Sequence, residues 1–139
     1  MAGYSGTPLA KKLGIKERFR VALVEVPSDV KGEIRDSLAG CSLAKNLEGP
    51  LDFVFLFTQS RQDLERKMKR AAAALAAAGM LWVAWPKKTS GVVTDLTEDV
   101  VRGIGLRAGL VDVKVCAVTE VWSGLKFVIP VARRSGRAE

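Results

Sequence analysis

Two apolar runs joined by one capped helical segment constrain the fold of this chain more than any other feature. The run LDFVFLFT, residues 51–58, lacks polar alternation, which is typical of a strand buried on both faces. A second run, MLWVAW, follows at residues 80–85. Between them, Ser60 and Asp63 form a capping box, and an apolar helical stripe continues to a closing Gly79. Strands joined by a helix must run parallel through a right-handed crossover.

The rest of the chain extends this alternation in both directions. Before the two runs, the sequence predicts a helix from Pro8 to Gly14 with Thr7 as N-cap and a strand over 19–27. Residues 28–50 predict a short helix and a weak strand near 41–44. After the two runs, we predict a helix that starts at Asp95 or Thr97 and ends at Gly109, then strands over 113–122 and 125–131 joined by a tight Ser123-Gly124 turn. We therefore predict an α/β fold, a three-layer Rossmann-like sandwich. Its mixed, mostly parallel sheet ends in an antiparallel hairpin.

The length fits one domain, and the charge suggests a polyanionic partner without requiring one. We place a single α/β domain over residues 1–132 of the 139 and a flexible basic tail over 133–139. The formal net charge is +7, but the basic residues are scattered and no aromatic stacking platform is interleaved with them. Nucleic acid is therefore not the expected partner. Weak, non-specific nucleic-acid binding through Lys67, Lys69, Arg70 and the tail is an open alternative.

Several chemistries lack the residues they need. The chain has no histidine, which removes the commonest general base and the commonest nitrogen ligand of metals. It has neither of the usual glycine-rich cradles for nucleotide phosphates and no metal-ligand spacing, so we predict no catalytic residue, no metal and no cofactor. Cys41 and Cys116 are interpreted as reduced, buried thiols. With no signal-like or membrane-spanning run, we expect no membrane association and a cytoplasmic location.

A basic loop directly after the MLWVAW strand is the best candidate site. Ligands of open α/β sheets bind outside the carboxyl ends of parallel strands. That rule places a small anionic ligand at a rim formed by Lys87, Lys88, Thr89, Ser90 and Gly91, with Ser60 and Asp95 beside them. The lysines supply charge and the hydroxyls supply hydrogen bonds. The alternative is that Glu98 and Asp99, at the start of the next helix, pair with both lysines and leave the loop satisfied without a ligand.

From LDFVFLFTQS to GLKFVIPV, the order of elements resembles the C-terminal half of a class I S-adenosylmethionine-dependent methyltransferase. Such enzymes carry a glycine-rich loop after the first strand, whereas this chain reads VEVPSDVKGE there. Pro27 and the three residues after it stand where close approach of a cofactor would favour glycine. The resemblance implies a fold, and a degenerate methyltransferase-like enzyme that uses Asp95 with Lys87 for proton transfer is a second alternative.

A closer resemblance spans nearly the whole chain. The segments GYSGTPLAKKLGI, LWVAWPKKTSGVVTDLTEDVVR, GLVDVKVCAV and WSGLKF resemble a small bacterial family of domains of unknown function. This resemblance implies a fold and supplies no mechanism. The residues and the resemblance together favour a non-catalytic α/β domain that binds a protein partner or a small anionic ligand at the rim. Self-association into a homodimer through the hairpin edge or the alanine-rich helix is also expected.

Overall fold

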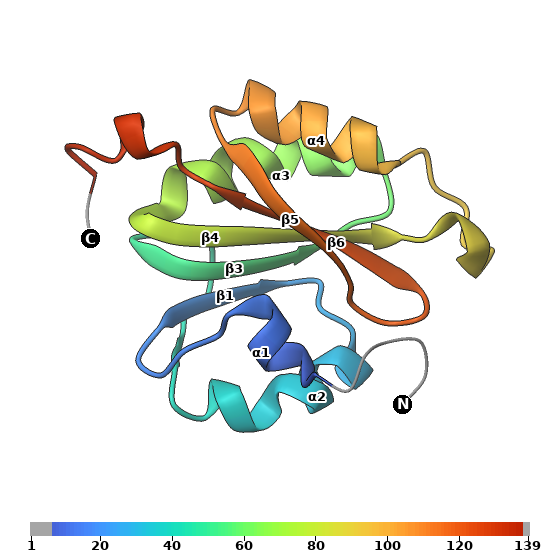
Figure 1. Cartoon of the computed structure of the whole chain (residues 1–139), viewed down its shortest axis with the longest axis horizontal. Helices are drawn as coiled ribbons and strands as arrows, with labels where there is room; N and C mark the ends of the chain where they lie inside the picture. Colours follow the sequence, from blue (N-terminus) through green and yellow to red (C-terminus); the bar gives the residue numbers. More distant parts are fainter. Residues whose placement is uncertain (1–6, 138–139) are drawn as a thin grey trace.

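The computed structural model describes residues 7–137 of the chain, which form one twisted sheet flanked by helices (Figure 1). The elements in chain order are α1 (Leu9–Leu13), β1 (Arg20–Val24), α2 (Ser28–Leu38), β2 (Ser42–Leu43), β3 (Leu51–Phe57), α3 (Arg61–Ala74), β4 (Leu75–Pro86), the 3-10 turn η1 (Lys88–Ser90), α4 (Glu98–Arg107), β5 (Val111–Ala117), β6 (Trp122–Val128) and the 3-10 turn η2 (Val131–Arg133). Within residues 7–137, every helix is too short or too polar to span a lipid bilayer.

The six strands lie in the order β2-β1-β3-β4-β6-β5. Neighbouring strands from β2 to β4 pair in parallel, whereas β6 pairs antiparallel with both β4 and β5. Consequently β5 runs in the same direction as the first four strands, and β6 is the only reversed strand among them. The predicted mixed, mostly parallel sheet with an antiparallel hairpin is confirmed.

Helices cover both faces of the sheet, as the buried strands require. Figure 1 shows α3 and α4 on one face and α1 and α2 on the other. The side chains of β3 alternate between the two cores: Val54 and Leu56 pack with α3 and α4, and the three phenylalanines of β3 pack with α1 and α2. Each of these five side chains is at most 2% exposed. The predicted three-layer sandwich is therefore confirmed.

Residues 28–50 fold as the weak pattern indicates. The helix α2 begins directly after Pro27 and buries Val30 and Ile34 completely, while Gly32 lies on its open side. Strand β2 has two residues and pairs parallel with β1 at the edge of the sheet. The predicted short helix and weak strand are both confirmed.

The alanine-rich segment corrects one predicted boundary. Helix α3 ends at Ala74, not at Gly79, and β4 begins at the next residue. Alanine permits both conformations, and pairing with β3 decides in favour of the strand: Leu51 is opposite Leu75, and Phe53 is opposite Met80 after a bulge. Gly79 does not cap the helix. It allows β4 to lie close to β3, because a Cβ at this position would lie 2.5 Å from the Leu51 carbonyl oxygen.

The predicted hairpin turn is also wrong. The turn lies between β5 and β6, where the Thr119 hydroxyl accepts hydrogen bonds from the backbone of Val121 and Trp122. Ser123 and Gly124 belong to β6 itself. Gly124 is needed for close packing, because a Cβ there would lie 2.9 Å from Val118 Cγ2 and 3.3 Å from the Trp82 ring.

The other predicted helix ends shift slightly or hold. Pro8 is the N-cap of α1, one position later than Thr7, and Gly14 closes it with φ of 83°. Thr97 caps α4 by accepting a hydrogen bond from the Val100 amide. The flexible basic tail from residue 133 stays a prediction. Within it, the Arg137 guanidinium donates to the carbonyls of Ala72, Ala73 and Leu75, where α3 ends and β4 begins.

Candidate functional site

The carboxyl ends of β1, β3 and β4 meet at one rim of the sheet, which we call the carboxyl-end rim. After β1 the chain enters α2 on one face, and after β3 it enters α3 on the opposite face. The two connections diverge between β1 and β3, so this point is the topological switch of the sheet. Ligands of open α/β sheets bind at such a crevice. One cavity lies beyond β4 and another lies at the switch point.

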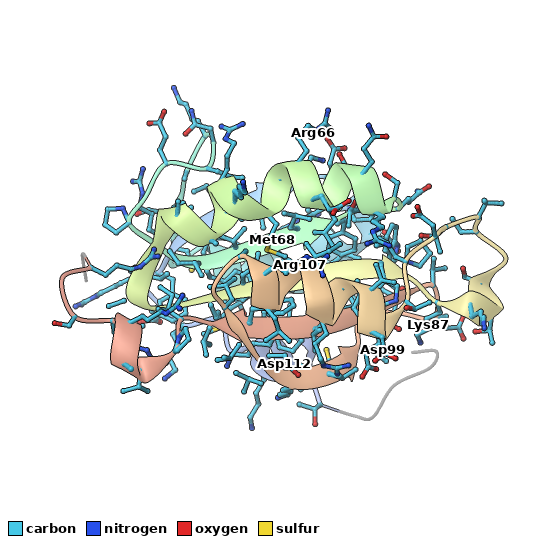
Figure 2. All side chains as sticks on the ribbon, turned by 90° about the horizontal axis from the view of Figure 1, so that it is seen from above. Arg66, Met68, Lys87, Asp99, Arg107 and Asp112 are labelled. Atoms are coloured by element: carbon cyan, nitrogen blue, oxygen red, sulfur yellow. The ribbon has the colours of Figure 1, made fainter. Side chains whose placement is uncertain are left out.

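The larger cavity, which we call the basic-loop cavity, has a volume of about 520 Å³. Its lining combines an apolar wall with hydroxyl and charged groups: Trp85, Pro86, Lys87, Lys88, Thr89, Val92, Thr94, Leu96, Thr97, Glu98 and Ser123. In Figure 2, Lys87 projects at the end of the molecule where Asp99 lies in the first turn of α4. The structure thus brings Lys87, Lys88 and Thr89 of the predicted site to one cavity.

Ser90 and Gly91 shape the loop without lining the cavity. The Ser90 hydroxyl donates to the Lys87 carbonyl at 2.6 Å and accepts a hydrogen bond from the Val92 amide at 3.1 Å. Gly91 has φ of 80°, a conformation that favours glycine. The loop is further tied to the hairpin turn, since the Lys87 amide donates to the Val121 carbonyl at 2.7 Å. These hydrogen bonds fix the backbone of the turn that carries Lys87 and Lys88.

Ser60 and Asp95 cap α3 and do not line the basic-loop cavity. The Ser60 hydroxyl accepts a hydrogen bond from the Asp63 amide at 3.1 Å, as the capping box predicts. The Asp95 carboxylate accepts a hydrogen bond from the Arg61 amide at 2.8 Å, which joins the loop before α4 to the first residue of α3. A role for these two residues in ligand binding stays a prediction. Their observed contacts hold the loops together at the rim.

The acids at the start of α4 are engaged by Arg102 and not by the loop lysines. The Arg102 guanidinium donates to Glu98 at 2.6 Å, to Asp99 at 3.0 Å and to Asp112 of β5 at 2.9 Å. The hydrogen bond from Arg102 lowers the pKa of Asp112 below its ordinary value. Among residues 7–137, neither Lys87 nor Lys88 forms an ion pair. The positive charge of the loop is therefore left without an acidic partner in this part of the chain.

The second cavity lies at the topological switch and has a volume of about 350 Å³. It is lined by Glu25, Pro27, Phe57, Thr58, Gln59 and Trp122. Glu25 has φ of 57°, which is rare for a residue with a side chain, and strain of this kind clusters at functional sites. Sequence reasoning assigned Glu25 to the strand and missed this position. The signal available was its place at the end of an apolar run, beside the rim.

The two cysteines and the acidic residues offer no further reactive centre among the described residues. Within that range, no group of three or more Cys, Asp or Glu residues is arranged to hold a metal ion. Cys41 and Cys116 are free thiols, and burial raises the pKa of each. A raised pKa keeps a thiol protonated and weakly nucleophilic at neutral pH. Both thiols are half-buried and not fully buried as predicted.

Residues 10–131 match a family described as Protein of unknown function (DUF3052). The chain belongs to this family. No curated protein matches the sequence. The DUF3052 assignment agrees with the family resemblance carried by the loop segment LWVAWPKKTSG and its flanks.

Several solved structures share this fold. Magnesium protoporphyrin IX methyltransferase from Synechocystis, solved with bound SAM, is 10% identical, with 88% of this chain and 74% of that chain covered and a TM-score of 0.58. Precorrin-6y C5,15-methyltransferase from Geobacter metallireducens is 13% identical, with 88% of this chain and 86% of that chain covered and a TM-score of 0.54. The fibrillarin pre-rRNA processing protein of Methanococcus jannaschii is 12% identical, with 91% of this chain and 70% of that chain covered and a TM-score of 0.53. At these identities the likeness shows the fold alone, and the predicted methyltransferase-like core is confirmed.

Proposed function

We propose that this DUF3052 domain is a non-catalytic binding domain that takes a small organic anion in the basic-loop cavity. The observation that carries the proposal is the pairing of charges at the mouth of the cavity. Glu98 and Asp99 are held by Arg102, so Lys87 and Lys88 keep two uncompensated ammonium groups on a concave surface. A carboxylate or phosphate group would compensate them with charge-assisted hydrogen bonds.

The lining also suggests what the rest of the ligand is like. The lining includes the apolar side chains of Trp85, Pro86 and Leu96 together with the hydroxyls of Thr89 and Ser123. Ligand sites combine a mostly apolar lining with a few placed polar groups. An anion with an aromatic or aliphatic body would use both parts, whereas inorganic phosphate would use only the lysines and hydroxyls. We therefore expect phenyl phosphate to bind more tightly than inorganic phosphate.

A methyltransferase activity is not favoured by the residues at the rim. The fold is shared with methyltransferases, but fold does not determine function. The chain places Pro27 after β1, where the resemblance calls for glycine, and α2 begins immediately afterwards. We expect S-adenosylmethionine to leave the thermal stability of the protein unchanged.

The test is a thermal shift measurement on the full chain with phenyl phosphate, inorganic phosphate and S-adenosylmethionine. We expect phenyl phosphate to raise the Tm of the parent, since a ligand present at a hundred times its Kd adds about 2.7 kcal/mol of stability. The double variant Lys87→Ala/Lys88→Ala should lose this shift. Its own stability should fall by under about 1 kcal/mol per residue, because Lys88 is exposed, Lys87 is only half-buried, and charges in contact with solvent contribute little.

A matched control separates the site from net charge. Lys11→Ala/Lys31→Ala removes two exposed lysines from α1 and α2, on the opposite face of the sheet, and should keep the full ligand-induced shift. Trp85→Ala is the structural contrast: it removes a ring that is 5% exposed and should cost about 3–5 kcal/mol. An equal loss of the shift in both lysine pairs would overturn the proposal. So would a double loop variant that fails to fold, because the lysines would then be structural.

A further inference from the structure

Four lysines from three distant segments gather on the α1 side of the sheet, near its β5 edge. We call Lys12, Lys16, Lys114 and Lys126 the lysine cluster. The Lys114 ammonium donates to the Lys12 carbonyl at 3.2 Å, and the Lys12 ammonium donates to the Ala117 carbonyl at 3.0 Å. Lys114 and Lys126 are direct cross-strand partners on β5 and β6. Tertiary contacts between α1 and the hairpin therefore create this concentration of charge.

The lysine cluster costs the folded state free energy. Like charges directly opposite on neighbouring strands repel each other. Burial lowers the pKa of Lys126, and the nearby charges of Lys114 and Lys16 lower it further. Among residues 7–137, no acid forms an ion pair with Lys16, Lys114 or Lys126. The acid nearest in sequence on β5, Asp112, is bound to Arg102 instead. The charges of Lys16, Lys114 and Lys126 are thus uncompensated within the described residues.

The cationic surface extends beyond the four lysines. Burial raises the pKa of the Cys116 thiol, and the positive charges of Lys12, Lys114 and Lys87 act to lower it, so all three lysines lie near this thiol. Lys87 belongs to the basic loop, so positive charge continues from the cluster toward the carboxyl-end rim. An extended run of ammonium groups matches a chain of phosphates better than it matches one small anion.

We propose that the lysine cluster binds the phosphate backbone of a nucleic-acid duplex without reading its sequence. Lysine presents a point charge and lacks the planar fork that arginine uses for bidentate base recognition. No aromatic ring belongs to the cluster, so it offers no platform for the unstacked bases of a single strand. Membrane-surface segments place Trp, Phe or Leu beside their basic residues. The exposed large apolar residues of β5 are valines, and Val115 is opposite Leu125 on the α4 side of the sheet, away from the lysine cluster. Charge and side-chain type together favour a duplex over a lipid surface.

The test is fluorescence anisotropy of the full chain with labelled 20-base-pair DNA duplexes of two unrelated sequences. We expect both duplexes to bind equally and binding to weaken steeply with salt. The triple variant Lys16→Gln/Lys114→Gln/Lys126→Gln should weaken binding at least tenfold in 50 mM salt. It should also flatten the slope of log K against log salt by about 2–3, since each neutralised phosphate contributes about 0.9.

A control triple, Lys31→Gln/Lys45→Gln/Lys69→Gln, removes the same charge from exposed positions elsewhere and should bind within threefold of the parent. If the first triple does not fold, the double Lys16→Gln/Lys114→Gln, which changes only exposed residues, should still weaken binding more than the control. The proposal fails if both triples weaken binding equally, or if the parent binds no duplex at 50 mM salt. Binding to phosphatidylserine vesicles without binding to duplex would overturn it as well.

Discussion

At the scale of single residues, several polar side chains near the rim serve the backbone before they can serve a ligand. Asp95 holds the Arg61 amide, Ser90 holds its own loop, and the Thr94 hydroxyl donates to the Gln59 carbonyl. These bonds satisfy a backbone donor at the start of α3 and backbone acceptors in the loops. Because such contacts join segments far apart in the sequence, the spacing of hydroxyl and acidic residues along the chain could not separate them from ligand-binding groups.

Lys126 gives a residue-scale prediction with an unusual sign. Its pKa is lower in the folded protein than in the unfolded chain, so the charged form is disfavoured on folding and stability is lower at pH 7 than after deprotonation. Lys126→Met keeps the apolar stem and removes the charge. We expect the Tm at pH 7 to rise, with a gain of under about 1 kcal/mol. Part of the gain should disappear in 1 M salt, which screens the repulsion by Lys114 and Lys16. A lower Tm in calorimetry would show that the ammonium group stabilises the fold.

At the scale of elements, α4 packs on the sheet through a glycine. A Cβ added at Gly105 would overlap the Phe127 ring of β6, whereas one added at Gly103 would approach only the end of the flexible Arg107 side chain, at 3.3 Å. The glycine at 105 therefore allows the close approach of helix and strand. Both glycines lie in the same helix, so they differ in packing and share the same cost in helix propensity.

These two positions make a matched pair of variants. Gly105→Ala should destabilise the protein by about 1–3 kcal/mol, because the ring and the helix must move apart. Gly103→Ala should be neutral or should stabilise the helix by up to about 1 kcal/mol. Urea unfolding monitored by tryptophan fluorescence measures both. Equal effects at the two positions would contradict the packing that the structure describes.

At the scale of the whole molecule, the absence of histidine determines how stability responds to pH. No side chain of ordinary pKa titrates between pH 5 and 8 without histidine. The pKa of Asp63 is lowered: burial acts to raise it, but hydrogen bonds from Thr58, Lys67 and Arg66 outweigh that effect. The pKa of Asp112 is lowered by its bond to Arg102. Their stabilisation is present above the unfolded pKa and is lost as pH falls through the folded values.

We therefore expect the free energy of unfolding to be nearly constant from about pH 5 to 8 and to fall below about pH 4. Urea titrations at intervals of one pH unit measure this profile. The double variant Asp63→Asn/Asp112→Asn should be less stable at pH 7 and should show a weaker acid dependence. A marked change between pH 5 and 8 would indicate a titrating group that this account does not include.

The open edge of the sheet also belongs to this scale. Strand β5 exposes Val113 and Val115, at 55% and 47%, which fits the expected self-association. The same strand carries a bulge beside Val113 and an exposed Lys114, two devices that discourage pairing between edges. Association through the hairpin edge therefore stays a prediction.

The alternation of strands and helices, the parallel crossovers and the basic loop after β4 were all predictable from the sequence. These features follow from apolar periodicity, from capping residues and from the Gly and Pro residues that end helices and strands, and all of these signals are local. The cap at Ser60 and the buried run at 51–57 needed no knowledge of distant residues.

The point where the alanine-rich segment changes from helix to strand depends on tertiary contacts. Alanine fits both conformations, and the pairing of Leu51 with Leu75 selects the strand. The ion pairs of Arg102 with the acids of α4 also depend on tertiary contacts, since the third partner of Arg102, Asp112, lies on β5. The lysine cluster depends on α1 packing against the hairpin. Each of these outcomes rests on contacts between distant segments, whose free energy no local pattern encodes.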